Sequence, residues 1–364
     1  MEITKVTLEQ LTSLLNKWYD SIRSQDTVLA LEIRNDIKEK IDRIDENQNI
    51  LLYYSLLEFR YQLLINDYKE SKTLLEKINS FEKPADDFIT YYYYFFKAIH
   101  ATEVGKFKEA NEYFSNAKEL LKNIPDEAEK AEFFYKAAAF YYQIRQPLVA
   151  INYATKAKKY YQNLLGYEIN IAGCTNILGL TCTSLSQYEA AEEYFINALD
   201  IVNKKNNTLL AQKIRHNLGF LYAEQNLSEA AIRNLSASIE DPETDYKCTF
   251  LLAREHFKLG HTEETNKFIE KGLEICNRLQ VVEYKHHFSI LHALNTEVPT
   301  NTFETIIKEG IQYFEEEGLL GFVHDYSKQL ALKFYASNQP DKAGQYFYKS
   351  HEAEQKLQDK EALK

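Results

Sequence analysis

Glycine, proline and cysteine are all scarce in this chain of 364 residues, which holds 11, 6 and 4 of them. Average usage is roughly 7% glycine and 5% proline. Nucleotide-binding α/β folds and all-β proteins need glycine at their turns, so the shortage favours long helices. No two of the cysteines, at positions 174, 182, 248 and 276, have CxxC spacing, and four are too few for a disulfide framework. We therefore expect reduced, buried thiols.

Long apolar runs and a basic charge balance are also missing. No stretch approaches the 18 uncharged apolar residues that a membrane-spanning helix needs. The N-terminal sequence MEITKVTLEQL contains no apolar core of a secretory signal. A net charge of −11 argues against a free-standing nucleic-acid binder, which needs a basic surface. We expect a cytoplasmic protein that contacts neither a membrane nor nucleic acid directly.

Common enzyme motifs are absent too. The sequence contains no GxxxxGK[ST], GxGxxG, GxSxG or HExxH pattern. The adjacent His286 and His287 point to different faces of a helix and have no cysteine or carboxylate partner at ligand spacing. We therefore predict no metal site and no cofactor of the protein's own. Composition and spacing alone indicate a helical-repeat interaction protein.

An internal repeat is the strongest pattern in the chain. Residues 105–120 (GKFKEANEYFSNAKEL) and 186–201 (SQYEAAEEYFINALDI) alternate aromatic residues and alanines at spacings of three, four and three, which places them on one helix face. Leu-Gly pairs at 178–179 and 218–219 precede the units that contain Ala191 and Ala231, as in the tetratricopeptide pattern. About seven such helix pairs are predicted over residues 91–364, forming a right-handed superhelix. The first alanine position recurs every 34 to 41 residues, at Ala110, Ala150, Ala191, Ala231, Thr265, Phe303 and Ala343.

The first 80 residues do not fit this repeat. Their pattern predicts three helices, over residues 7–23, 26–44 and 49–79, with an apolar stripe on the third that is typical of bundle packing. The segment at 81–90 contains the first proline of the chain and is predicted to be a linker. The expected all-α architecture is therefore a three-helix bundle followed by the repeats.

A resemblance to a known family sharpens this interpretation. The stretch QNILLYYSLLEFR, the Trp18-Tyr19 pair before it and KAEFFYKAAAFYY at 130–142 resemble the Rap proteins, the response-regulator aspartate phosphatases of Bacillus and its relatives. The resemblance extends along the whole chain. It implies that the bundle and early repeats dock a response regulator, and that the repeats bind a short imported signalling peptide that ends the docking. Family members act in quorum sensing, sporulation and competence.

The resemblance also implies a catalytic role for Gln48. A neutral amide can orient a water molecule for attack on the aspartyl-phosphate of a receiver domain, which supplies its own Mg²⁺. Receiver contacts are expected at Asn47, Leu51 and Phe59, although the last two suit the bundle core equally well. Asn47 departs from the family, in which we expect an acidic residue at that position.

The peptide site is predicted from the repeat register. In a tetratricopeptide unit the residues just before Leu-Gly point to the concave face, and here these include Asn217 in RHNLG and Asn176 in TNILG. An asparagine amide can pair with both the N–H and the C=O of an extended peptide, and Asn217 resembles the family's peptide anchor. Glu224 is expected to replace a missing acidic partner for a basic peptide residue, because Ser184 stands where the family suggests an acid. The same register adds His216, Phe250 and Arg254.

Three functions remain open at this stage. The first is a peptide-inhibited phosphatase, and the second is a non-catalytic protein that sequesters the DNA-binding domain of a response regulator. The third is a generic tetratricopeptide scaffold that clamps a carboxylate. Such a clamp needs several Lys and Asn residues in adjacent repeats, and only Lys213 with Asn217 approximates it.

Overall fold

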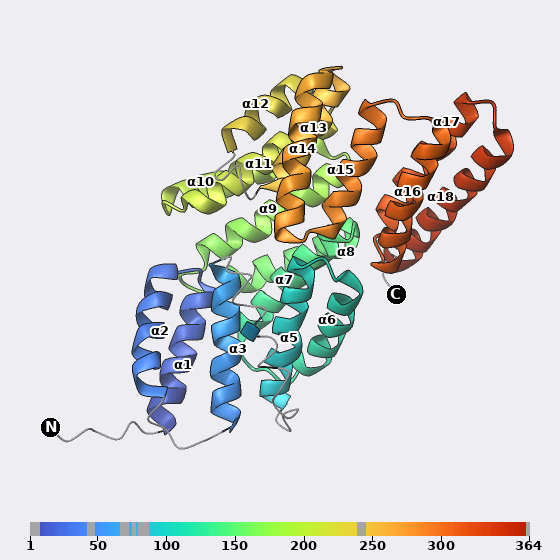
Figure 1. The fold of residues 1–364 in the computed structure, drawn as a ribbon. Coiled ribbons are helices and arrows are strands. Elements are labelled where there is room, and N and C mark those ends of the chain that lie inside the picture. The colour runs from blue at the N-terminus through green and yellow to red at the C-terminus, as the bar shows by residue number, and fades with distance from the viewer. Residues whose placement is uncertain are drawn as a thin grey trace. The chain divides into compact units, whose positions relative to one another are not determined.

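The computed structural model is helical throughout the parts of the chain that it describes (Figure 1). These parts are residues 8–41, 48–65, 73–74, 78, 87–238 and 245–361. Within them there are no strands, which confirms the predicted all-α fold class. Contacts divide the chain into two compact units, with residues 1–103, 109–133 and 160–170 in unit 1 and residues 104–108, 134–159 and 171–364 in unit 2.

Unit 1 is built around the first three helices. An apolar stripe on α1, formed by Leu11, Leu15, Trp18 and Ile22, is completely buried, because spacings of four, three and four place these side chains on one face. Helix α1 packs against α2 and α3, and α3 packs against α5. The helices of this unit are α1 (Leu8–Arg23), α2 (Thr27–Ile41), α3 (Gln48–Leu64), α5 (Asp87–Glu103) and α6 (Phe107–Leu121), with the first part of α7 (Glu127–Gln143).

Helix α3 is shorter than the sequence pattern predicts. It ends at Leu64, and Ile65 lies in a turn, so the prediction of one helix over residues 49–79 is wrong. Ile65 is 42% exposed, and burial therefore does not favour continuing the helix at that point. Helix α5 begins at Asp87, inside the segment expected to be a linker.

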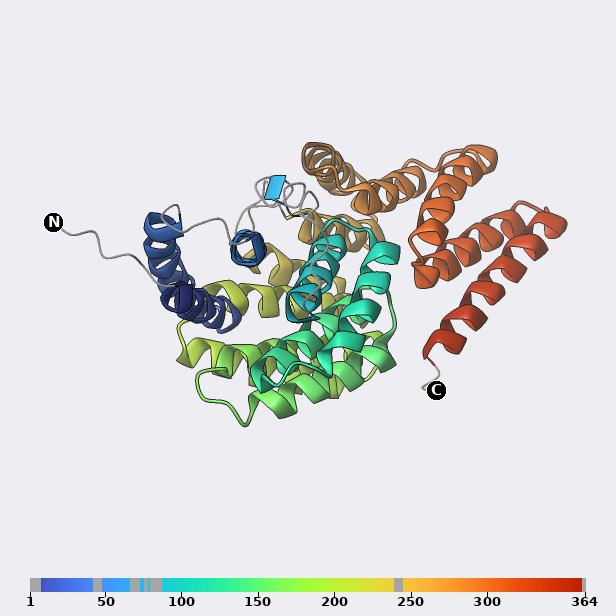
Figure 2. The same ribbon diagram turned by 90° about the horizontal axis from the view of Figure 1, so that it is seen from below.

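Unit 2 consists of helices that pair with their neighbours in sequence. Contacts join each helix from α10 onward to the next, and α16, α17 and α18 lie side by side in both views (Figures 1 and 2). The remaining helices are α8 (Pro147–Tyr161), α9 (Glu168–Ser184), α10 (Tyr188–Lys204), α11 (Thr208–Glu224), α12 (Ser228–Ser238), α13 (Tyr246–Lys258), α14 (Thr262–Leu279), α15 (Val282–Asn295), α16 (Thr300–Glu316), α17 (Leu320–Ala336) and α18 (Pro340–Glu361).

The predicted repeat register matches the packing. All seven anchor positions, from Ala110 to Ala343, are at most 2% exposed. The glycines of the Leu-Gly pairs are close-approach points, since a Cβ on Gly179 would lie 2.7 Å from the Phe195 ring and one on Gly219 would lie 2.8 Å from Leu235. Small residues at these positions let the two helices of a pair approach closely.

The turns inside the helix pairs explain why glycine can be so rare. Each of the seven turns from α5–α6 to α17–α18 contains one residue with a left-handed backbone. Only two of the seven are glycine. Asparagine, which tolerates this conformation better than most residues, supplies two more. The seven residues are Gly105, Arg145, Ser186, Asn226, Gly260, Glu297 and Asn338.

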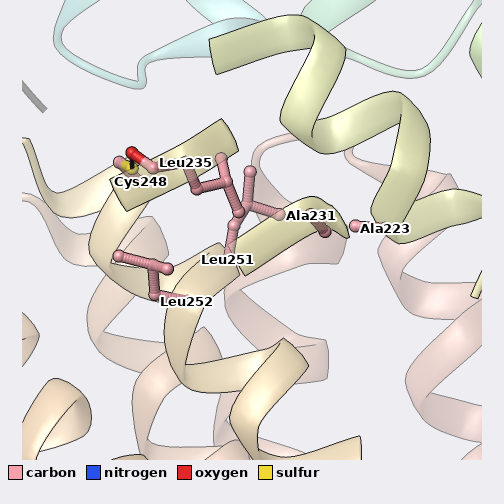
Figure 3. Close-up of a cluster of buried hydrophobic side chains, with 6 residues drawn as sticks. All are labelled: Ala223, Ala231, Leu235, Cys248, Leu251 and Leu252. Carbon is pink, nitrogen blue, oxygen red and sulfur yellow. Dashed lines mark hydrogen bonds between the residues drawn. The ribbon is translucent and has the colours of Figure 1, made fainter. Parts of the chain in front are cut away.

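The core between α11, α12 and α13 is a compact apolar cluster (Figure 3). Its buried members are Ala223, Ala231, Leu235, Cys248, Leu251 and Leu252. Figure 3 shows Cys248 at one end of this cluster, beside Leu235. All four cysteines are buried and unpaired, as the sequence predicted.

Candidate functional site

Two predicted peptide-binding residues meet in unit 2. Asn217 on α11 donates a hydrogen bond from Nδ2 to Oδ1 of Asn176 on α9, over 2.8 Å. The two residues are 41 positions apart, or one repeat, and both side chains are half-buried. The Asn217 carbonyl oxygen and the Asn176 amino group make no other hydrogen bond to residues that the structure describes. The pair therefore presents an acceptor and donors side by side, which is the complement of a peptide backbone.

The packing of α11 gives Asn217 its direction. Gly219 lies against Leu235 of α12, so this face of α11 is pressed onto its partner helix. Residues two positions apart on a helix differ by about 200° in direction. Asn217 consequently lies on the side of α11 opposite to α12, while α9 supplies its amide partner.

A charged cluster on α11 and α13 contains two more predicted residues, Glu224 and Arg254. The Arg254 Nη2 atom lies 2.8 Å from Oε1 of Glu224, and its Nε lies 3.0 Å from Oε1 of Glu255. Glu255 is completely buried and also accepts from Lys258 at 2.9 Å and from Ser228 at 2.7 Å. Glu224 is therefore ion-paired with Arg254 in this structure, and its role as the acidic partner of a basic peptide residue stays a prediction.

Aromatic rings surround the predicted residue Phe250. Its ring centroid lies 5.8 Å from that of Tyr284, 5.4 Å from His287 and 5.4 Å from Phe288. His287 in turn contacts the hydroxyl of Tyr326 through Nδ1 at 2.6 Å. Phe250 is half-buried, so one side of the ring belongs to this aromatic cluster.

His216 lies in a different setting from its neighbour Asn217. Its imidazole approaches the start of α13. There a ring nitrogen of His216, a carboxylate oxygen of Asp245 and Sγ of Cys248 all lie within 4.8 Å of one another. Asp245 caps α13 by accepting from the backbone N–H of Cys248 at 2.9 Å. Sequence analysis missed this group, because His216 lies on α11 whereas Asp245 and Cys248 lie at the start of α13.

The predicted receiver-binding residues lie in unit 1. Gln48 is the first residue of α3 and is exposed, and its amide has no hydrogen-bond partner among the described residues. Leu51, one turn further along, is half-buried. Phe59 is completely buried, with its ring 5.4 Å from that of His100, and so it is a core residue rather than part of an exposed docking surface. Asn47 lies outside the described residues.

Sequence analysis also missed a buried charged cluster that joins α1 to α7. Arg23 at the end of α1 lies 2.6 Å from Asp126 and 3.2 Å from Glu129, which is completely buried. Tyr91 donates a hydrogen bond to Glu129 over 2.7 Å. Burial raises the pKa of Glu129 to about 7, against the opposing effects of Arg23 and Tyr91. The charged residues within and just before the otherwise aromatic segment 130–142 could have indicated this cluster.

A second buried ion pair fixes α3 to the same helix. Arg60 lies 2.9 Å from Glu132, and Tyr161 donates to the other oxygen of that carboxylate over 2.8 Å. Both members of the pair are nearly inaccessible to solvent. Breaking a buried pair by removing one partner typically costs 3–5 kcal/mol, so these contacts hold α1 and α3 firmly on α7.

Comparisons with known proteins agree with this architecture. A family model described as response regulator aspartate phosphatase H, N terminal, matches residues 5–66. Regulatory protein RapK of Bacillus subtilis (strain 168) is 26% identical over 373 residues, which cover 99% of this chain and 100% of RapK. Response regulator aspartate phosphatase I of the same organism is 27% identical and covers 99% of this chain and 94% of its own. The chain is thus similar to the Rap proteins along nearly its whole length.

The solved structures of the Rap family share its fold. A Rap protein complexed with Competence and Sporulation Factor matches with a TM-score of 0.81, over 96% of this chain and 99% of that chain, at 22% identity. The resemblance to the Rap proteins predicted from the sequence is thus confirmed. Among the described residues, no helix is both long enough and apolar enough to span a membrane.

Proposed function

We propose that this protein binds a response regulator through unit 1 and hydrolyses the aspartyl-phosphate of its receiver domain. A short signalling peptide bound by unit 2 would inhibit this activity. The observation that carries the proposal is the exposed Gln48 amide at the head of α3. It lies inside residues 5–66, the stretch that matches the phosphatase family model.

The chemistry requires little from the protein itself. An aspartyl-phosphate is an acyl phosphate, and the receiver supplies the Mg²⁺ that neutralises its charge. What the protein adds is a water molecule held in line with the phosphorus, and an amide can hold it with both a donor and an acceptor. A glutamine has this positioning role in GTPases. The absence of competing partners among the described residues leaves both functions of the Gln48 amide available.

Peptide binding is supported by the Asn176–Asn217 pair. An extended peptide can bond its C=O and N–H groups to these amides without regard to its side chains. The charged cluster of Glu224, Arg254 and Glu255 and the ring of Phe250 then offer side-chain selectivity. The solved Rap structure in complex with Competence and Sporulation Factor supports this assignment by its fold.

The catalytic part can be tested by the release of radiolabelled phosphate from a panel of phosphorylated receivers. Gln48→Ala is expected to slow hydrolysis by about 100-fold, because a misplaced water loses the in-line geometry, and to leave receiver affinity within a few-fold. Asn49→Ala, which changes the next exposed amide of α3, is the matched control. Near-normal hydrolysis by Gln48→Ala would contradict the catalytic role. Tight binding without hydrolysis by the unmodified protein would instead favour the second function, sequestration of a response regulator without catalysis.

The peptide part can be tested with labelled synthetic pentapeptides and hexapeptides encoded beside the gene. Asn217→Ala is expected to weaken binding about tenfold, since one or two hydrogen bonds to the peptide are lost. Asn295→Ala is a matched control, because Asn295 donates to Asn266 over 2.8 Å in the same unit. A double-mutant cycle with Asn176→Ala should give less than additive losses. Unchanged peptide affinity in Asn217→Ala would refute the site.

A further inference from the structure

We propose that His216, Asp245 and Cys248 form a binding site for a divalent metal ion of the zinc type. The three residues come from the middle of α11 and the first turn of α13. Their ligand atoms, an imidazole nitrogen, a carboxylate oxygen and a thiol sulfur, lie within 4.8 Å of one another. This mixture of nitrogen, oxygen and sulfur ligands is the set that Zn²⁺ prefers, whereas Mg²⁺ and Ca²⁺ prefer oxygen alone.

The distances are close to those of a bound site. Zinc bonds of 2.0 to 2.3 Å in tetrahedral geometry place ligand atoms roughly 3.3 to 3.7 Å apart. The three ligand atoms therefore have to approach one another by at most about 1.5 Å to bind an ion. Rotation of His216 and Asp245 can supply this movement, because both side chains are half-buried rather than packed in the core. Cys248 is the fixed member, anchored in the apolar cluster of Figure 3.

The hydrogen bonds around the group prepare it for a metal. One oxygen of Asp245 accepts from the backbone N–H of Cys248 at 2.9 Å, which holds the carboxylate beside the thiol and leaves the second oxygen for an ion. Ligating carboxylates are commonly oriented by such a bond. Cys248 Sγ lies 3.5 Å from the Leu235 carbonyl oxygen, a weak hydrogen bond that a metal ion can replace.

Zinc-type ions bind cysteine as the thiolate. A bound ion would therefore replace the thiol proton of Cys248, and each ion bound would release one proton.

Three protein ligands leave one tetrahedral position for water, as in open zinc sites. The ion would tie the first turn of α13 to α11, one residue from Asn217. The site depends on these three side chains alone and stands whether or not the proposed phosphatase activity does.

Cobalt provides the direct test, because Co²⁺ takes the same ligands as Zn²⁺ and shows a thiolate charge-transfer band in the near ultraviolet. The reduced full-length protein is titrated with Co²⁺ without oxygen, and the band is expected to saturate at one ion per chain and to disappear on adding Zn²⁺. Cys248→Ser should abolish the band, and Cys276→Ser, which changes another buried cysteine, should retain it. Absence of the band in the unmodified protein, or its persistence in Cys248→Ser, would overturn the proposal.

Two further measurements do not depend on whether Cys248→Ser, which changes a buried residue, folds normally. His216→Ala changes a half-buried side chain and is expected to weaken Co²⁺ binding by roughly tenfold or more. The Zn²⁺ affinity of the unmodified protein should rise about tenfold per pH unit between pH 7 and 8.5, because one thiol proton is released. A pH-independent affinity, or unchanged Co²⁺ binding in His216→Ala, would also refute the three-residue site.

Discussion

The buried carboxylate of Glu129 predicts an unusual pH dependence of stability in unit 1. Glu129 is completely inaccessible to solvent, 3.2 Å from Arg23 and 2.7 Å from the hydroxyl of Tyr91. Burial raises its pKa from 4.5 to about 7, although both partners lower it. The folded protein therefore binds a proton at this carboxylate in a pH range where the unfolded chain has already lost it.

The sign of the effect follows from this difference. A folded-state pKa above the unfolded value gives a contribution that is fully present below pH 4.5 and is lost as the pH rises through about 7. A shift of about 2.5 pH units corresponds to roughly 3 kcal/mol, since each unit is worth 1.36 kcal/mol. Glu129→Gln carries a permanently neutral amide and is expected to lose this part of the pH dependence.

The single tryptophan of the chain makes the measurement specific. Trp18 is buried in unit 1, with its ring centroid 6.0 Å from that of Tyr54 and 5.9 Å from that of Tyr61. Its fluorescence therefore reports the unfolding of this unit. Urea unfolding of the full chain is followed at pH 5 and pH 7.5 in the unmodified protein and in Glu129→Gln. The change in unfolding free energy between the two pH values should differ by about 2.4 kcal/mol between the proteins, because part of the full effect lies below pH 5.

Glu127 offers a matched control in the first turn of the same helix, because it is exposed and forms a surface ion pair with Lys130. Glu127→Gln should keep the pH profile of the unmodified protein. If Glu129→Gln also keeps that profile to within about 0.5 kcal/mol, the carboxylate is ionised in the folded state at pH 5. Arg23 then outweighs burial, and the reasoning is refuted.

Two further predictions concern unit 2. Gly272→Ala is expected to destabilise the protein by about 3 kcal/mol, because the new Cβ would lie 2.0 Å from the buried ring of Phe288. Thermal unfolding followed by circular dichroism measures this loss, and an unchanged melting temperature would contradict the prediction. Burial raises the pKa of Glu304, but hydrogen bonds from Lys342 and Tyr346 outweigh this and lower it to about 2. Its stabilising contribution is therefore present above pH 4.5 and lost as the pH falls toward 2, and acid titration of Glu304→Gln should lack that component.

The scaffold could be predicted because its determinants are local. An anchor such as Ala191 or Ala231 must be small to let a helix pack closely, and an aromatic or leucine residue of the partner helix fills the space beside the glycine. Both requirements act within one helix pair and depend on a spacing of three or four residues. The end of α3 was missed, because an apolar stripe shows which face is buried but not where burial stops.

The candidate site was predicted only in part, because its chemistry depends on which side chains meet across helices. The repeat register placed Glu224 and Arg254 on the same surface, but it could not show that they bind each other. It placed His216 beside Asn217, whereas the structure directs its imidazole to Asp245 and Cys248, 29 and 32 residues further along the chain. Phe59 was open to two interpretations until its burial became known.

Recurrence explains which site residues the sequence could reveal. A feature that serves every repeat occurs seven times in this chain, so chance variation at one position, such as Thr265 or Phe303, does not hide it. Asn176 and Asn217 share part of this advantage, because an asparagine stands shortly before the Leu-Gly pair in two adjacent repeats and the two side chains meet in space. Gln48 and Cys248 each occur in one setting only. For residues of that kind periodicity carries no information, and their roles have to be argued from exposure, partners and distance.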